Sequence, residues 1–289
     1  MIPKIIHYCW FGGTPLPDIA QKCIASWKKY CPNFEIKEWN ERNFNINCCT
    51  YVKEAYDAKK WAFVSDFARF WILYHEGGIY FDTDVELINS IEDLLAIGPY
   101  MGCEKIESSV LKGVVNEEQL NSLTSTVAVN PGLGIAAEPD MKLFKEILDF
   151  YQDCHFLKED GTYNLTTVVT YTSRILSAYG WKPENRIQNL NEMTIYPTEY
   201  FCPMDYNTGV VTLSEETRSI HHYVASWQSG QEKRYFQITQ VLQRIFGRKV
   251  GRVIGRFIDF PHRVKKKIKQ KGLKETIMFS IKKIKRKLG

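Results

Sequence analysis

Asp82 and Asp84, separated by Thr83, have the residue types and spacing of a cation site. On an extended chain, side chains two positions apart point to the same side, so two carboxylates in this pattern can hold one hard cation. Mg²⁺ and Mn²⁺ favour carboxylates together with substrate phosphate oxygens. Such an ion neutralises a diphosphate and stabilises it as a leaving group. An exposed acidic turn is the alternative interpretation of the same residues.

The residues before this pair place it after a buried strand. Gly77-Gly78 ends a helix that the pattern predicts over residues 51–75, as one helix or as two pieces, and residues 79–81 form a short apolar strand. In open α/β sheets, ligands bind at the carboxyl ends of strands. Haloacid-dehalogenase phosphatases also place Asp-x-Asp after an apolar strand, but they need Thr or Val where this chain has Glu86, which excludes that class.

The predicted helix also carries Asp66 and Arg69, which are three residues apart and therefore share a face. One interpretation is a local ion pair. The other places both side chains at the rim of a sugar-nucleotide pocket, where an arginine binds phosphate or fixes a carboxylate that grips sugar hydroxyls. Spacing alone favours the local ion pair.

The order of elements predicts an α/β fold. Residues 4–10 read as a buried strand, residues 18–30 as a helix and residues 34–37 as a second strand. Further strands are expected at 125–129 and 134–137, around a turn at Asn130-Pro131-Gly132, and at 194–201 and 220–224. Helices are expected at 140–151 and 166–179.

Charge divides the chain unevenly. Of the 289 residues, those from Gly247 to Gly289 include sixteen Lys and Arg against two acids, whereas the rest has 22 basic and 31 acidic residues. Apolar residues recur at helical spacing among these basic residues, a pattern typical of helices that lie on anionic membranes. We therefore predict a domain at 1–240 and a basic amphipathic helical tail at 241–289. A solvated, disordered tail ranks second and nucleic-acid binding third; no nucleic acid is expected as a partner.

The cysteines and the N-terminus predict a cellular compartment. The eight cysteines contain no CxxC pair, and the stretch after Met1 does not have the pattern of a signal peptide. Reduced thiols are expected in a cytoplasmic protein. With the basic tail, this predicts a peripheral protein at the inner face of the plasma membrane.

Three stretches of the chain together resemble a known family. They are Ile5-Ile6-His7-Tyr8-Cys9-Trp10-Phe11-Gly12-Gly13, Ser65-Asp66-Phe67-Ala68-Arg69 and Leu73-Tyr74-His75-Glu76-Gly77-Gly78-Ile79-Tyr80-Phe81-Asp82-Thr83-Asp84. They resemble the DXD-containing sugar transferases of glycosyltransferase family 32. That family includes bacterial capsular and other polysaccharide transferases and yeast Golgi α-mannosyltransferases, and it is distantly similar to the glucosylating domains of clostridial toxins. The resemblance covers roughly residues 1 to 230.

The resemblance implies a GT-A fold, a single Rossmann-like nucleotide-diphosphosugar transferase domain. It also implies a role for each matching residue. Trp10 would stack on the base beside the backbone of Ile6 and His7, although core packing is the alternative for this tryptophan. Asp66 and Arg69 would contact the sugar and phosphates, Tyr80 would line the ribose or sugar side, Asp82 would reach the ribose and metal-bound water, and Asp84 would ligate the metal.

The element His221-His222-Tyr223-Val224-Ala225-Ser226-Trp227 resembles a C-terminal element of the same family. The resemblance implies that His222 completes the metal site, and that Ser226 and Trp227 close over the diphosphate. Asn130 lies where the family has an asparagine near the donor sugar, although the spacing after it departs from the family's pattern.

The function implied is a retaining, Mn²⁺- or Mg²⁺-dependent hexosyltransferase. Its donor would be a nucleotide-sugar, with a UDP-sugar expected, and its acceptor a saccharide, expected to be lipid-linked, in the synthesis of capsular or other surface polysaccharide. Two alternatives remain open. One is a catalytically inactive relative that binds sugar nucleotides, and the other is an interaction protein that acts at a membrane surface through its tail.

Overall fold

The computed structural model describes the chain except residues 108–110, 112–113, 115–125, 225–229 and 272–289. It divides into two compact units, which are described separately below. The sheet unit comprises Met1–Asp205 and Val211–Trp227, and the helical unit comprises Tyr206–Val210 and Gln228–Gly289. Within the described residues, no helix combines the length and the apolar composition that crossing a membrane requires.

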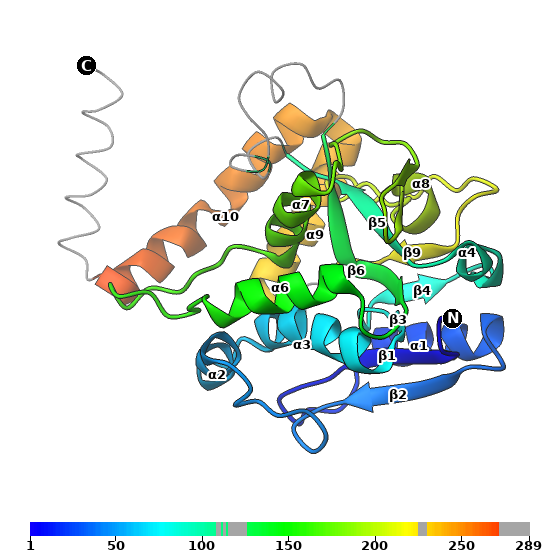
Figure 1. The fold of residues 1–289 in the computed structure, drawn as a ribbon. Coiled ribbons are helices and arrows are strands. Elements are labelled where there is room, and N and C mark those ends of the chain that lie inside the picture. Colours follow the sequence, from blue (N-terminus) through cyan, green and yellow to red (C-terminus); the bar gives the residue numbers. More distant parts are fainter. Residues whose placement is uncertain (108–110, 112–113, 115–125, 225–229, 272–289) are drawn as a thin grey trace. The chain divides into compact units, whose positions relative to one another are not determined.

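The sheet unit is built on a seven-stranded mixed sheet with the order β2-β1-β3-β6-β5-β8-β7 (Figure 1). Strands β2, β1, β3, β5 and β8 run in one direction and β6 and β7 in the other. A separate antiparallel pair joins β4 to β9. The bounds are β1 Ile5–Cys9, β2 Glu35–Trp39, β3 Gly78–Tyr80, β4 Val85–Leu87, β5 Tyr100–Lys105, β6 Val127–Ala137, β7 Gln188–Asn189, β8 Thr194–Tyr196 and β9 Ser219–His221.

Seven helices of the sheet unit lie within the described residues. They are α1 Asp18–Tyr30, α2 Thr50–Asp57, α3 Trp61–Glu76, α4 Glu92–Ile97, α6 Lys142–Gln152, α7 Val168–Ala178 and α8 Thr198–Phe201. One core cluster joins the sheet to α2, α3, α6 and α7, and a second joins it to α1, α4 and α8. Side chains alternate along the strands between the two clusters, as Ile79 and Tyr80 of β3 do. The α/β fold predicted from the sequence is confirmed.

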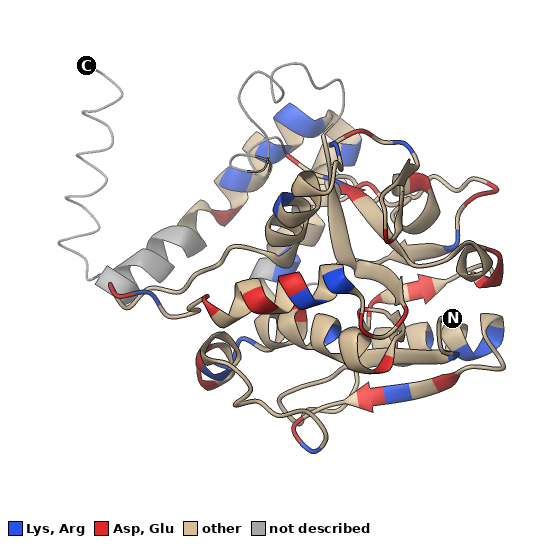
Figure 2. Ribbon diagram, viewed as in Figure 1, with Lys and Arg blue, Asp and Glu red and all other residues tan. Residues whose placement is uncertain are grey.

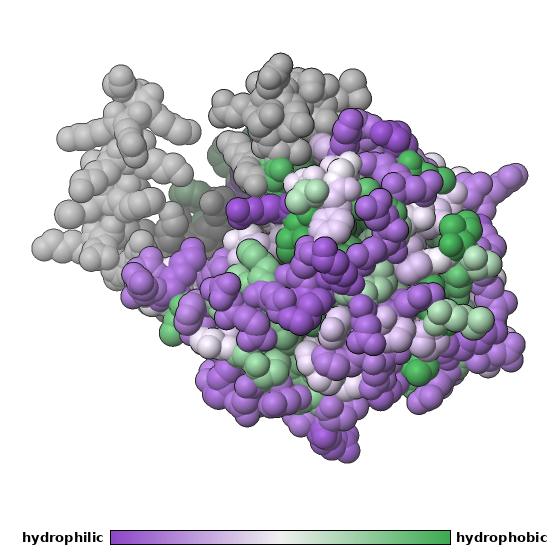
Figure 3. Space-filling model, viewed as in Figure 1, coloured by the Kyte–Doolittle hydropathy of each residue, from purple (hydrophilic) through white to green (hydrophobic). Residues whose placement is uncertain are grey.

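The surface matches this arrangement of two buried clusters. Where the sheet unit is visible in Figure 3, hydrophilic residues predominate and apolar areas are small. The largest fully buried side chains are aromatic, among them Trp27, Tyr80 and Tyr151. The high aromatic content of the chain therefore fills the core rather than forming a broad apolar patch on this face.

Three predicted elements differ in the structure. The strand expected at 194–201 is the short strand β8, which is followed by helix α8. The helix expected over residues 51–75 is divided into α2 and α3, because the chain turns at Ala58–Lys60, where Lys59 has a φ of +56°. The two strands expected around residues 130–132 are one strand, β6, whose register against β5 shifts between Met101 and Gly102. Met101 pairs with Ile135 and Gly102 with Asn130, so the intervening residues of β6 bulge out of the ladder.

Strand β3 lies between β1 and β6, and a buried polar contact fixes its start. His7 of β1 accepts a hydrogen bond at Nδ1 from Trp39 Nε1 (3.0 Å) and donates from Nε2 to the Gly77 carbonyl (3.0 Å). Burial lowers the pKa of His7 to about 4, so this ring is neutral at pH 7. Gly78 has a φ of +93°, and a Cβ at this position would lie 2.7 Å from the Ile5 carbonyl oxygen. Only glycine fits here without strain.

The helical unit contains α9 Gly230–Phe246 and α10 Arg248–Lys271. Gly251 and Gly255 of α10 let the two helices approach closely, since a Cβ at Gly251 would lie 2.4 Å from the Gln243 nitrogen. Helix α10 continues past Pro261. Basic residues of both helices are coloured blue in Figure 2. The second apolar stretch predicted in the tail, at 277–288, lies outside the described residues.

We expect Gly78→Ala to lower the free energy of unfolding by about 1–3 kcal/mol more than Gly180→Ala does. The two glycines have similar φ values, +93° and +90°, but a Cβ at Gly180 meets nothing within 4 Å. The difference therefore isolates the clash with β1 from the backbone strain. Chemical denaturation of the two variants measures it, and equal losses would contradict the close contact.

Candidate active site

Asp82 and Asp84 lie in a tight turn that follows β3. The Val85 amide donates to the Asp82 carbonyl (3.0 Å), so Thr83 and Asp84 are the central residues of a turn rather than part of an extended chain. We call residues 82–85 the DXD turn. The turn still brings the two carboxylates together. One oxygen of each and a ring nitrogen of His221 all lie within 4.8 Å of one another, a grouping that could hold a metal ion.

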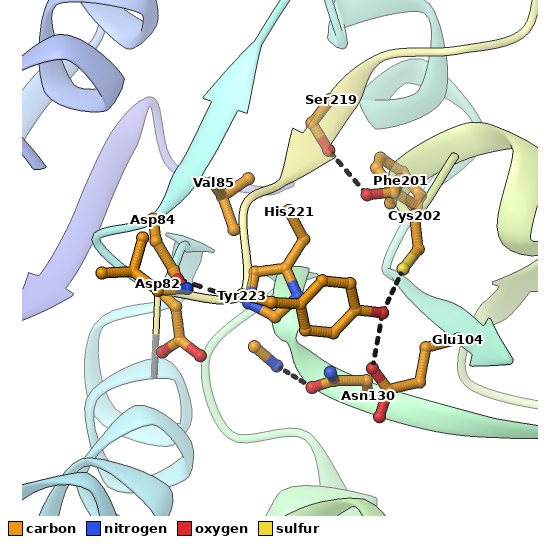
Figure 4. Close-up of polar contacts among 12 residues, drawn as sticks. Asp82, Asp84, Val85, Glu104, Asn130, Phe201, Cys202, Ser219, His221 and Tyr223 are labelled. Atoms are coloured by element: carbon orange, nitrogen blue, oxygen red, sulfur yellow. Dashed lines mark hydrogen bonds and ion pairs between the residues drawn. The ribbon is translucent and has the colours of Figure 1, made fainter. Parts of the chain in front are cut away.

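His221 reaches Asp84 because β9 pairs with β4, which follows the turn directly. Val85 is the register partner of His221. His221 Nε2 lies 3.3 Å from Asp84 Oδ1, and the backbone amide of Val224 donates to Asp84 Oδ2 (2.8 Å). Figure 4 shows the two side chains facing each other. Burial acts to raise the pKa of Asp84, but His221 and the backbone amide outweigh it and lower the pKa below its ordinary value.

Asp82 is held against the bulge of β6. Its amide donates to the Gly132 carbonyl (3.2 Å), and Gly132 in turn donates to Asn130 Oδ1 (2.7 Å). A Cβ at Gly132 would lie 2.1 Å from Asp82 Oδ2, so the backbone here fits closely around the carboxylate. Burial is the main cause that raises the pKa of Asp82, and the charge of Asp84 adds to it. Asn130 thus lies next to the acidic pair.

Arg69 approaches the same carboxylate from α3. Its Nη2 lies 2.8 Å from Asp66 Oδ1 and 3.3 Å from Asp82 Oδ1, and its guanidinium lies 4.9 Å from the centre of the Tyr80 ring. Tyr80 donates from its hydroxyl to Asp82 Oδ1 (3.1 Å). Arg69 is only 3% exposed, and its Nη1 is buried with no hydrogen-bond partner. A buried charged donor without a partner is costly.

Asp66 is more than the local partner of Arg69. It lies beside the start of α7, where the amide of Val168 hydrogen-bonds to it. Burial raises the pKa of Asp66 to about 7, although Arg69 acts to lower it. The local ion pair therefore explains only the contact of Asp66 with Arg69. Because Arg69 also contacts Asp82, Asp66 and Arg69 are both connected to the DXD turn.

The histidine that joins the acidic pair is not the one predicted. The sequence assigned His222, but His222 Nε2 lies 2.8 Å from Glu86 Oε2, which also binds Lys22. The structure brings His221 to Asp84 instead. The alternation of β9 explains the difference, since Ser219 and His221 point inward while Ile220 lies on the other side. The sequence alone did not show that β9 pairs with β4, and this pairing brings His221 to Asp84.

The residues predicted to bind the base lie on and after β1. Ile6 and the side chain of His7 are fully buried, so only their backbone could face a ligand. Trp10 is partly exposed beyond the end of β1, and its Nε1 donates to the Thr14 carbonyl (2.6 Å). A partly exposed ring after a sheet strand leaves room for stacking on a base. Ser226 and Trp227 lie outside the described residues.

The chain matches a known family over the segment that contains this site. Residues 17–100 match the family described as "Glycosyltransferase sugar-binding region containing DXD motif". An uncharacterized glycosyltransferase, L373 of Acanthamoeba polyphaga mimivirus, is 33% identical over 124 residues, which are 40% of this chain and 49% of that protein. The chain thus spans about half the length of the curated relative it matches. Residues 17–100 are therefore similar to a glycosyltransferase sugar-binding region of the DXD type, in agreement with the resemblance found in the sequence.

Two solved structures show a more distant similarity. The PaToxG glycosyltransferase superposes with a TM-score of 0.41 at 14% identity, over 62% of this chain and 70% of that one. A glycosyltransferase involved in the glycosylation of the major capsid of PBCV-1 superposes with a TM-score of 0.43 at 10% identity, over 81% of this chain and 99% of that one.

We expect Gly132→Ala to lower the affinity of the protein for Mn²⁺ by about tenfold or more, because the added methyl group must displace Asp82. Titration calorimetry of the metal-free protein measures the affinity. Gly161→Ala is the control, since a Cβ there meets nothing within 4 Å. Unchanged Mn²⁺ binding by a folded Gly132→Ala protein would show that the cation does not use Asp82 in this position.

Proposed function

We propose that this protein is a metal-dependent glycosyltransferase that uses a nucleotide-sugar donor. The observation that carries the proposal is the convergence of Asp82, Asp84 and His221 next to Arg69, whose Nη1 is buried and unpaired. This arrangement offers ligands for one cation and a fixed positive charge beside it. A nucleotide diphosphate, which is a strongly anionic leaving group, fits both features.

The donor set fits a hard divalent cation. Two carboxylates and one imidazole suit Mn²⁺, and carboxylates with substrate phosphate suit Mg²⁺. Asp82, Asp84 and His221 would hold the ion, which supplies positive charge to the departing diphosphate when bound. The Val224 amide keeps the Asp84 carboxylate oriented, and the Gly132 carbonyl accepts a hydrogen bond from the backbone amide of Asp82.

Charged and aromatic side chains of the protein would bind the other parts of the donor. Arg69 stays protonated between Asp66 and Asp82 and presents Nη1 to the donor, where it can bind a phosphate oxygen. Asp66 can accept hydrogen bonds from sugar hydroxyls. Tyr80 holds Asp82 and limits the rotation of its carboxylate. Trp10, partly exposed at the end of β1, would stack on the base.

We infer transfer with retention at the anomeric carbon from the family resemblance. In a front-face mechanism the leaving phosphate takes the proton of the acceptor hydroxyl, so no covalent nucleophile is required of the protein. The donor is proposed to be a UDP-hexose and the acceptor a saccharide carried on a lipid, in the synthesis of surface polysaccharide. Trapping a sugar covalently attached to the protein would contradict the front-face mechanism.

The helical unit supports the proposal of a peripheral membrane protein at the inner face of the plasma membrane. Val250, Val253 and Phe257 of α10 are at least half exposed and recur at helical spacing. Arg248 and Arg256 of the same helix are also exposed. An exposed apolar stripe with adjacent basic residues suits an anionic lipid surface, which would bring the enzyme to a lipid-linked acceptor.

We expect slow donor hydrolysis by the purified protein with one member of a panel of UDP- and GDP-sugars. EDTA and Asp84→Asn should each reduce nucleotide release by about a hundredfold or more, since the leaving group then loses its cation. Released nucleotide is measured by chromatography. Absence of release from every donor, together with absence of nucleotide binding by calorimetry, would favour an inactive relative.

His221→Ala and His222→Ala form a matched pair within this experiment. Loss of activity in the first variant alone is expected, because His221 lies beside Asp84 whereas His222 pairs with Glu86. The reverse result would restore the assignment made from the sequence.

We expect the protein to co-sediment with vesicles rich in phosphatidylglycerol at low salt and not with phosphatidylcholine vesicles. Reversing two charges, Arg248→Glu with Arg256→Glu, should weaken binding by about thirtyfold or more, since each basic residue near such a surface contributes about 1 kcal/mol. Lys142→Glu with Lys145→Glu, on exposed positions of α6, is the control with the same change of charge. Equal losses in both double variants would contradict a surface centred on α10.

A further inference from the structure

The loop after β1, which carries Trp10, is held by the segment that follows β2. We call residues 10–14 the β1 loop. The Trp10 amide donates to the Trp39 carbonyl (2.8 Å), which extends the ladder between β1 and β2 past the end of β1. The Gly12 amide then donates to Glu41 Oε1 (2.7 Å). The β1 loop is therefore tied at two points to the end of β2 and the residues beyond it.

Strand register brings the β1 loop and the DXD turn to the same edge of the sheet. Strands β1 and β3 run in parallel with His7 opposite Tyr80, and the Phe81 amide donates to the His7 carbonyl (3.1 Å). Each strand ends within two residues of this pair, and the β1 loop follows β1 as the DXD turn follows β3. In open α/β sheets, ligands bind at the carboxyl ends of such strands. A donor held at the DXD turn therefore lies beside the β1 loop.

Glu41 belongs to a cluster that surrounds Gly12. The hydroxyl of Tyr56, on α2, donates to the same Glu41 oxygen (3.2 Å). The Tyr56 ring contacts the ring of Trp61, the first residue of α3, with 4.9 Å between centroids. Trp61 in turn lies against Gly12, where a Cβ would come within 2.6 Å of the indole Nε1. Glu41, Tyr56 and Trp61 thus fix the position of Gly12 from three different segments.

The β1 loop needs this support because of its two adjacent glycines. Gly12 and Gly13 have φ values of +92° and +66°, in the region that glycine adopts far more readily than other residues. A glycine pair has many accessible conformations, so contacts from outside the loop must select one of them. A hydrogen bond to a carboxylate is stronger than one between neutral groups. The bond from the Gly12 amide to Glu41 is therefore well suited to hold the loop in one conformation.

The conformation of the loop decides how the Trp10 ring is oriented. The ring is partly exposed, and its Nε1 donates to the Thr14 carbonyl (2.6 Å). The indole is therefore fastened to the far end of the loop that Trp10 itself begins. Gly12 lies midway between these two residues. A change of backbone conformation at Gly12 moves the Thr14 carbonyl relative to Trp10 and releases the ring from its orientation.

We propose that Glu41 is a positioning residue for the base of the donor, acting through the backbone of Gly12 on the ring of Trp10. This inference rests on the proposed function, in which Trp10 stacks on the base. Glu41 orders the β1 loop before the donor binds, so that binding loses less conformational entropy. Its effect is confined to the nucleoside part of the donor, and the affinity for the diphosphate does not depend on it.

The test compares two ligands of the full-length protein by titration calorimetry in the presence of Mn²⁺. One is UDP, or GDP if the wild-type protein binds GDP more tightly, and the other is inorganic diphosphate, which has no base. Glu41→Ala should weaken nucleotide binding by about tenfold and leave diphosphate binding unchanged. Glu41→Gln should bind the nucleotide within about twofold of the wild-type protein, because its amide oxygen can accept both hydrogen bonds.

Trp10→Ala connects the effect of Glu41 to the stacking ring. This variant should weaken nucleotide binding by about tenfold or more, since stacking of one base on an aromatic side chain contributes that much. Adding Glu41→Ala to it should cause no further loss, because Glu41 acts through Trp10. If Glu41→Ala does not fold, Tyr56→Phe removes one of the two hydrogen bonds to Glu41 instead. It should weaken nucleotide binding by about threefold and leave diphosphate binding unchanged.

Glu54→Ala is the matched control for folding. Glu54 also accepts hydrogen bonds from backbone amides of another segment, those of Phe156 (2.8 Å) and Leu157 (2.9 Å). This variant should unfold at a lower temperature and keep its affinity for both ligands. If it loses as much nucleotide affinity as Glu41→Ala does, general destabilisation explains both variants and the positioning role of Glu41 fails.

Three further results would overturn the role of Glu41 while leaving the proposed function in place. One is wild-type nucleotide affinity in Glu41→Ala beside a clear loss in Trp10→Ala. Another is an equal loss of nucleotide and diphosphate binding in Glu41→Ala. The third is a double variant that loses about a hundredfold, the product of two independent effects. If the wild-type protein binds neither ligand in the presence of Mn²⁺, the proposed function and this inference fail together.

Discussion

The site depends on holding Asp82 and Asp84, both partly buried, side by side after a sheet strand. Two carboxylates this close repel each other, and moving them out of water adds a further cost. The fold offsets both costs from opposite sides. Arg69 of α3 lies 3.3 Å from Asp82, and His221 of β9 lies 3.3 Å from Asp84. Neither cation is close in sequence to the DXD turn, so the acidic pair is tolerable only in the completed sheet unit.

The local backbone is shaped by the same requirement. Gly132 must lack a side chain because Asp82 occupies the space of its Cβ, and the bulge in β6 is what brings Gly132 there. Gly77 and Gly78 take positive φ values so that α3 can end and β3 can begin within two residues. As a result, Arg69 of α3 lies close enough to Asp82, which follows β3, to form an ion pair.

The sequence predicted the parts of this site that lie in local patterns. Helix α1, the α3–β3 junction and the carboxylates of the DXD turn follow from periodicity, glycine placement and motif. It missed features that depend on pairing between distant segments. His221 is the last residue of β9 and His222 follows it, and the register of β9 with β4 decides that His221 lies beside Asp84. Glu41 carries no motif, because it gains its position only when the segment after β2 meets the loop after β1. Asn130-Pro131-Gly132 is typical of a turn, so the sequence did not predict that β6 continues through Pro131.

The charges of the site also explain why cation and donor would bind together. Arg69 and His221 lie against the two carboxylates of the DXD turn, and Arg69 is shared with the buried Asp66. Under the proposed function, a divalent cation held by Asp82, Asp84 and His221 would add positive charge to the site. A diphosphate beside Arg69 Nη1 then balances this charge. Binding of either partner is thereby strengthened by the other, and the thermodynamic linkage between them is reciprocal.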